Sequence, residues 1–186
     1  MRTTTGMLVT LGLLLAGTGT TAVAAVKDSA KDGFTIENER VVPVDAATAW
    51  RALVEDVDRW WPKDHTWWGA ASTLSIQARA GGCFCEVAGA QQAQHLTVTF
   101  VDPNKTLRMI GGLGPLQGMG VSGALEFRLA AAEAGGTRIT LYYRAGGYSS
   151  DDLSKIAPVV DRVQGLQLEG LAAYLRQRAA PAGRPR

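Results

Sequence analysis

The stretch LEFRLAAAEAGGTRITLYY, residues 125–143, determines the fold class of this sequence. On both sides of Gly135-Gly136, a dipeptide typical of turns, apolar side chains alternate with polar ones. A period of two is typical of a strand with one buried face. Pairing Leu129 with Ile139 places all the large apolar residues of this hairpin on one face. The other pairs are then Phe127 with Leu141 and Leu125 with Tyr143.

The same alternation continues outward on the N-terminal side. Further strands are expected at residues 34–44, 74–78, 83–87, 96–100 and 107–109. Asp102-Pro103-Asn104-Lys105 forms a tight turn because Pro presets φ at its second position. Pairing Phe100 with Leu107 across that turn also pairs Val98 with Met109. The pattern predicts an antiparallel sheet of about seven strands.

Two segments have helical spacing instead. Asp45 is a suitable N-cap for a short helical pair after the first strand, and Pro62 ends that pair. A long helix is expected from about Asp151 to Arg178, with Pro158 marking its main start or a kink. The order of elements predicts an α+β fold, with the long helix lying across one sheet.

The N-terminus is typical of a secretory signal. Arg2 precedes the apolar run 7–16, and Ala22-Val23-Ala24 provides a small-residue cleavage site. We expect a signal peptide over 1–25, a flexible mature N-terminus over 26–33, a single domain over 34–178 and a disordered tail over 179–186. The protein would be periplasmic or secreted, without stable membrane insertion once the signal is removed. An uncleaved anchor is the alternative.

The mature chain is nearly neutral. One of the 19 basic residues, Arg2, lies in the signal, which leaves 18 against 17 acidic residues. This balance argues against a nucleic-acid partner. The glycine-rich segment 111–120 lacks the strand-then-helix setting of a phosphate loop, so we expect no nucleotide and no cofactor.

Several stretches resemble one superfamily. They are Trp50 to Pro62 (WRALVEDVDRWWP), Gly81 to Glu86 (GGCFCE) and Leu107 to Leu125 (LRMIGGLGPLQGMGVSGAL), with Ala157 to Leu168 fitting a C-terminal helix. They resemble the SRPBCC (START-like, helix-grip) superfamily, and within it bacterial members of the branch of heat-shock-protein ATPase activator homologues and polyketide cyclase-like proteins. The resemblance implies a curved sheet wrapped around the long helix. It also implies a cavity between them that holds an apolar small molecule or lipid. The chaperone-linked members are cytosolic, so the export signal leaves any protein partner unknown.

The residues expected to line this cavity share apolar character or an inward position on the sheet. They are Trp67, Trp68, Glu86, Val98, Met109, Leu116, Met119, Phe127, Tyr143 and Val163. Trp67 and Trp68 either form the mouth or pack in the core, as we expect of Trp60 and Trp61. Segment 111–120 is either a lid or an ordinary connection between strands. A filled core without a ligand is the alternative to a cavity.

Glu86 is the candidate acid or base for an enzyme of the cyclase or dehydratase type, acting alone or together with His95. A carboxylate in an apolar cavity would have a raised pKa and could transfer protons. Glu86 could instead be exposed, or paired with Arg79 or Arg108. The sequence leaves open whether the protein is an enzyme at all.

Cys83 and Cys85 allow a bridge, a redox role or a metal site. Residues i and i+2 of a flat strand lie about 6.5–7 Å apart, so a disulfide would be strained or would need a bulge. If Phe84 faces inward, both thiols face outward and Glu86 faces inward. Pairing Glu86 with Leu96 then puts His95 beside the thiols, as candidate ligands for zinc or copper(I).

Overall fold

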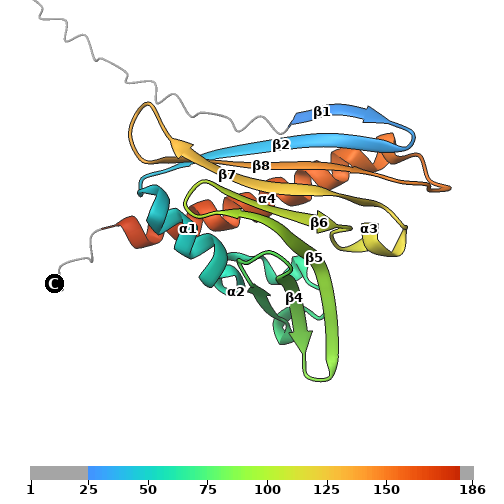
Figure 1. Cartoon of the computed structure of the whole chain (residues 1–186), viewed down its shortest axis with the longest axis horizontal. Coiled ribbons are helices and arrows are strands. Elements are labelled where there is room, and N and C mark those ends of the chain that lie inside the picture. Colours follow the sequence, from blue (N-terminus) through green and yellow to red (C-terminus); the bar gives the residue numbers. More distant parts are fainter. Residues whose placement is uncertain (1–24, 181–186) are drawn as a thin grey trace, which may run out of the picture.

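The computed structural model describes residues 25–180 and has an α+β architecture (Figure 1). Its eight strands form one curved, open, antiparallel sheet in the order β1-β2-β8-β7-β6-β5-β4-β3. The strands are β1 (Ala25–Ala30), β2 (Gly33–Val42), β3 (Thr73–Ile76), β4 (Cys83–Ala88), β5 (Gln91–Asp102), β6 (Thr106–Gly111), β7 (Ser122–Ala131) and β8 (Thr137–Gly146). The α+β prediction is confirmed, and the strand count is eight instead of seven.

The helices cover one face of this sheet. They are α1 (Ala46–Glu55), α2 (Val57–Trp60), the 3-10 turns η1 (Lys63–His65) and η2 (Gly69–Ala71), the short α3 (Pro115–Gly118) and the long α4 (Leu153–Ala179). The Asp45 carboxylate accepts a hydrogen bond from Thr48 N at 2.6 Å, which confirms the predicted cap of α1. α4 is one continuous helix that contains Pro158 near its start. No helix within residues 25–180 combines the length and apolar character needed to cross a membrane.

The N-terminal end of the described chain differs from the prediction. Residues 26–33 were expected to be flexible, but β1 pairs with β2 and then turns into it. The backbone explains this difference, because an additional strand satisfies the N–H and C=O groups along the outer side of β2. Residues 1–24 of the predicted signal peptide lie outside the described residues, as do residues 181–186 of the predicted tail.

The predicted registers were right for one hairpin and partly wrong for another. β7 and β8 pair Leu129 with Ile139 and keep the alternation throughout. β5 and β6 pair Val98 with Met109 as expected, but Phe100 lies opposite Arg108. A bulge at Thr99 adds one residue to β5. Each later side chain of β5 therefore lies on the opposite face of the sheet from the one predicted. Phe100 is therefore 44% exposed instead of buried.

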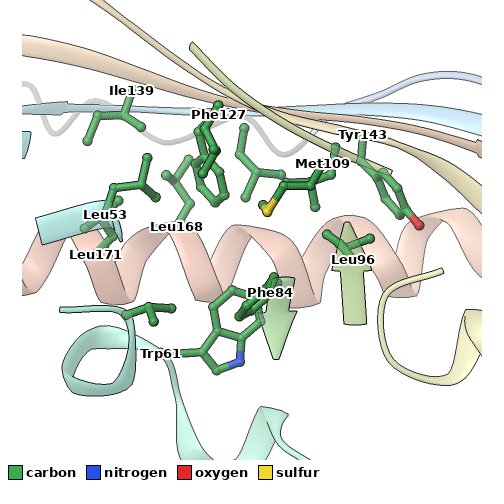
Figure 2. Close-up of a cluster of buried hydrophobic side chains, with 14 of the residues drawn as sticks. Leu53, Trp61, Phe84, Leu96, Met109, Phe127, Ile139, Tyr143, Leu168 and Leu171 are labelled. Atoms are coloured by element: carbon green, nitrogen blue, oxygen red, sulfur yellow. The ribbon is translucent and has the colours of Figure 1, made fainter. Parts of the chain in front are cut away.

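The core lies between the sheet and α4. Figure 2 shows Phe127 and Met109 of the sheet in one apolar cluster with Leu168 and Leu171 of α4. Trp60 and Trp61 are both buried, as predicted. A buried polar contact also joins the two layers, because Asn38 of β2 donates to the Asp161 carboxylate of α4 at 2.9 Å. The central part of the sheet is therefore packed against α4.

Candidate ligand pocket

A pocket of about 390 Å³ lies beside the N-terminal half of α4. Three segments enclose it: the face of α4 from Ile156 to Gln167, the stretch Trp61–Trp67 around η1, and the α3 segment, defined here as residues 111–120. On α4 the lining residues are Ile156, Val159, Val160, Val163, Gln164 and Gln167. Their spacing of three and four residues places them on one face of the helix.

The α3 segment closes one side of the pocket. Leu116 and Met119, both predicted as ligand contacts, line it together with Leu113. The Tyr143 hydroxyl fixes the start of this segment, donating to Gly111 O at 3.0 Å and accepting from Leu113 N at 3.4 Å. Burial raises the pKa of Tyr143 to about 12. Tyr143 therefore positions the segment and does not itself line the pocket.

The mouth of the pocket is apolar and accessible. Trp67 lines it with 48% of its surface exposed, and Val159 on α4 is 55% exposed. Trp68, predicted with Trp67 as a pair, is absent from the lining. An exposed indole beside an exposed valine gives an apolar ligand an initial contact surface.

Other predicted contacts lie elsewhere. Val163 lines the pocket, but Val98, Met109 and Phe127 are core residues that do not reach it. The pocket is therefore not between the middle of the sheet and α4, where these three residues pack. It lies where the stretch around η1 and the α3 segment approach α4, since side chains already fill the space over the middle of the sheet.

Glu86 is fully buried and holds the segment that leads to the mouth. One of its carboxylate oxygens accepts from Ser72 Oγ at 2.5 Å and from Trp67 N at 2.8 Å. The other oxygen is 2.8 Å from His95 Nε2. Burial acts to raise the pKa of Glu86, but the hydrogen bonds from Ser72, His95 and Trp67 outweigh it and hold that pKa below its usual range. The raised pKa expected from the sequence is therefore wrong, because the site supplies donors.

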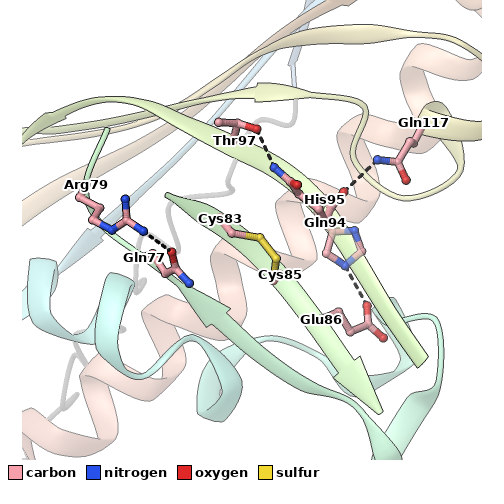
Figure 3. The surroundings of a disulfide bond; sticks show 9 residues. All are labelled: Gln77, Arg79, Cys83, Cys85, Glu86, Gln94, His95, Thr97 and Gln117. Carbon is pink, nitrogen blue, oxygen red and sulfur yellow. Dashed lines mark hydrogen bonds and ion pairs between the residues drawn. A yellow bond between two sulfur atoms is a disulfide. The ribbon is translucent and has the colours of Figure 1, made fainter. Parts of the chain in front are cut away.

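His95 lies on the opposite face of the sheet from that predicted. Phe84 pairs with Leu96 and Cys85 with Gln94, so His95 is an extra, bulged residue of β5. The bulge lets His95 and Leu96 both point inward although they are consecutive. Figure 3 shows the result: His95 meets Glu86, away from the two cysteines. His95 also lines the pocket, whereas Glu86 stands behind it.

The cysteine pair forms a disulfide, with Cα atoms 5.4 Å apart (Figure 3). This separation is shorter than the about 6.5–7 Å of a flat strand, so β4 is contracted at the bridge. Phe84 and Glu86 face inward as predicted. The proposed metal set of Cys83, Cys85 and His95 is wrong, because the sulfurs bond to each other and the imidazole lies on the other face. Residues 25–180 contain no cluster of three metal-ligating side chains.

Sequence reasoning missed the polar part of the lining. Asp64, His65 and Thr66 contribute from η1 and the residue after it, and Gln164 and Gln167 from α4. The helical face that begins at Ile156 and passes through Val163 also includes both glutamines, so its periodicity could have indicated them. The result is a mainly apolar pocket with a small number of polar groups, as ligand sites usually are.

Comparisons with known proteins identify the fold alone. No protein-family model and no curated protein matches this sequence. An uncharacterized protein from Rhizobium leguminosarum is similar in structure with a TM-score of 0.54 and 19% identity, over 78% of this chain and 96% of that one. CalU16 from Micromonospora echinospora is similar with a TM-score of 0.56 and 16% identity, over 80% of this chain and 78% of that one. MLL2253 from Mesorhizobium loti is similar with a TM-score of 0.55 and 19% identity, over 79% of this chain and 99% of that one.

Proposed function

We propose that this protein is an exported member of the SRPBCC (helix-grip) superfamily that binds an apolar small molecule or lipid in the pocket beside α4. The open curved sheet with a long C-terminal helix is compatible with that superfamily, as are the stretches that resemble it. The signal-like N-terminus supports export. A bridged cysteine pair also suits an oxidising compartment.

The observation that carries the binding proposal is the pocket itself. Folded proteins normally close their cores, so a mainly apolar space of about 390 Å³ is a specific feature. Its volume lies at the lower end of the range for small-molecule sites, roughly 300–1,000 Å³. A single small ligand therefore fits better than a two-chain lipid.

Proton transfer by His95 is a second candidate function. The observation that favours it is the Glu86 carboxylate 2.8 Å from His95 Nε2, an arrangement that orients an imidazole at the pocket wall. Glu86 was the expected acid or base, but it is buried behind the wall with a lowered pKa. In a cyclase or dehydratase reaction, His95 would contact the substrate, and Glu86 would hold the His95 imidazole in position.

Native mass spectrometry and binding of an apolar fluorescent dye test the proposed function. We expect an apolar molecule to co-purify, or the dye to bind saturably to the purified protein. Val163→Phe should block binding because the larger phenylalanine side chain would occupy part of the pocket. Leu166→Phe is the matched control, since Leu166 lies on the same helix with its side chain exposed and outside the pocket.

Two results would contradict the proposal. One is a wild-type protein that carries no apolar molecule and binds no dye. The other is unchanged dye affinity in Val163→Phe, when circular dichroism shows that both variants are folded.

A further inference from the structure

The Cys83–Cys85 bridge lies on the outer face of the sheet, away from the pocket and α4. Phe84 and Glu86 point inward from β4, so the two cysteines between and beside them point outward, and both are partly exposed. Figure 3 shows the bridge on the side of β4 away from Glu86 and His95. Because solvent reaches this bridge, a thiol from another molecule can reach it as well.

The bridge does not join separate parts of the fold. It links two residues of one strand, with only Phe84 between them. Strand β4 is already paired on both sides, with β3 and with β5. Closing so short a loop stabilises the fold by at most about 2 kcal/mol. Strand pairing therefore holds the two sulfurs near each other whether the bridge is closed or reduced, and the bridge can open without unfolding β4.

The surroundings of the bridge favour attack by a thiolate. The cross-strand neighbours of the two cysteines are uncharged: Thr97 lies opposite Cys83, and Ser75 and Gln94 lie opposite Cys85. Figure 3 places the exposed Arg79 at the Cys83 end of the bridge. The attacking and leaving sulfurs of an exchange reaction are negatively charged, so uncharged neighbours and a nearby cation do not oppose the reaction.

Exposed apolar side chains flank the bridge on the same face. Val87 follows Cys85 along β4 and is 40% exposed. Ile110 of β6 is 39% exposed and lies opposite Thr97, the residue opposite Cys83. Two strand spacings separate Ile110 from Cys83, which is about 10 Å. An extended protein segment can contact these apolar side chains while one of its cysteines reaches the bridge, and a small thiol cannot.

We propose that Cys83 and Cys85 form a thiol–disulfide exchange site that oxidises pairs of cysteine thiols in an extended protein segment. A thiolate of the segment attacks one sulfur of the bridge, the Sγ–Sγ bond breaks, and the other cysteine leaves as a thiolate. The second thiolate of the segment then attacks the segment's sulfur in the mixed disulfide and releases the remaining cysteine.

The reaction moves two electrons from the segment to Cys83 and Cys85. The segment gains a disulfide, and its two thiol protons pass through solvent to the new thiols of the protein. A second disulfide compound, such as oxidised glutathione, restores the bridge by the same exchange in the opposite direction. The site therefore turns over as long as such a disulfide is supplied.

Oxidation of reduced, unfolded ribonuclease A in a glutathione buffer tests this proposal. We expect a catalytic amount of the protein to speed the loss of ribonuclease thiols at least about fivefold, since exchange rates follow access to the attacked sulfur. The double variant Cys83→Ser/Cys85→Ser should lose this acceleration. Val87→Ser/Ile110→Ser should lower it at least about threefold because apolar contact with the segment is lost. Its reaction with dithiothreitol, a small dithiol, should be unchanged.

Val163→Phe is the control, because it alters the pocket and leaves the bridge intact, and it should keep the full acceleration. The proposal would be overturned if the wild-type protein gave no acceleration, or if folded Cys83→Ser/Cys85→Ser accelerated the reaction equally. Undiminished acceleration by Val87→Ser/Ile110→Ser would overturn the assignment of a protein segment as the substrate. Dye binding by the same variants reports on the pocket separately, so these failures are distinguishable from failure of the proposed binding function.

Discussion

Replacing Glu86 tests whether its buried carboxylate organises the pocket wall. Glu86→Leu removes the acceptor of four donors, which are Ser72 Oγ, Trp67 N, Trp68 N and His95 Nε2. A buried donor left unpaired costs about 1–3 kcal/mol. Relief from burying a charge offsets part of this loss. We expect the free energy of unfolding to fall by about 3 kcal/mol in Glu86→Leu, and by about 1–2 kcal/mol in Glu86→Gln, which keeps one acceptor oxygen.

Urea unfolding at pH 7 measures these losses, with an unchanged m value showing that two-state unfolding is preserved. Glu133→Gln is the control: Glu133 is exposed in the β7–β8 turn, so the change should be within about 0.5 kcal/mol. The reasoning would be refuted if Glu86→Leu were no less stable than this control.

Acid titration gives the same prediction a second measurement. The pKa of Glu86 is lower in the folded protein than its usual value of 4.5, so the unfolded chain binds more protons below that pH. The stabilisation by ionised Glu86 is therefore complete above about pH 4.5 and is lost as the pH falls through the folded pKa. The stability difference between the wild type and Glu86→Gln should shrink on acidification. A difference that grew would contradict the assigned direction.

Two further predictions concern the core and the disulfide. Phe127→Ala should reduce the free energy of unfolding by about 3–5 kcal/mol because it opens a cavity, whereas Phe100→Ala should cost less than about 1 kcal/mol. Urea unfolding compares them, and an equal loss would contradict the bulge that exposes Phe100. Reducing the Cys83–Cys85 bridge should cost at most about 2 kcal/mol, since the loop it closes is very short. Thermal unfolding with and without reductant measures this, and collapse of the fold on reduction would show that the bridge has a larger role.

The sequence predicted the sheet and α4 because their patterns are regular. The β7–β8 hairpin keeps strict alternation, so its register follows from matching apolar faces. Strand β5 was harder, because it contains bulges at His95 and Thr99. Each bulge changes the parity of the strand without changing the composition of the sequence, which is why Phe100 and His95 were assigned to the wrong faces.

The site was predictable only in its apolar part. Trp67, Leu116, Met119 and Val163 stand out as large apolar residues in suitable places, and the structure puts them around one pocket. Polar residues on a helix are normally expected to face solvent, so neither Gln164 nor Gln167 attracted attention. Their burial depends on how segments distant in the sequence pack around α4, which local patterns do not encode.

Within residues 25–180 the open sheet has two margins without a neighbouring strand, and each one disfavours self-association. Unpaired strand edges can add a strand from another molecule, which is a common route to fibres. At one margin, β1 carries the charged residues Lys27 and Asp28, and an added strand would have to desolvate them. At the other margin, β3 has only four residues and offers few hydrogen bonds to a second molecule. The protein can thus leave its sheet open along α4 without making either edge a template for aggregation.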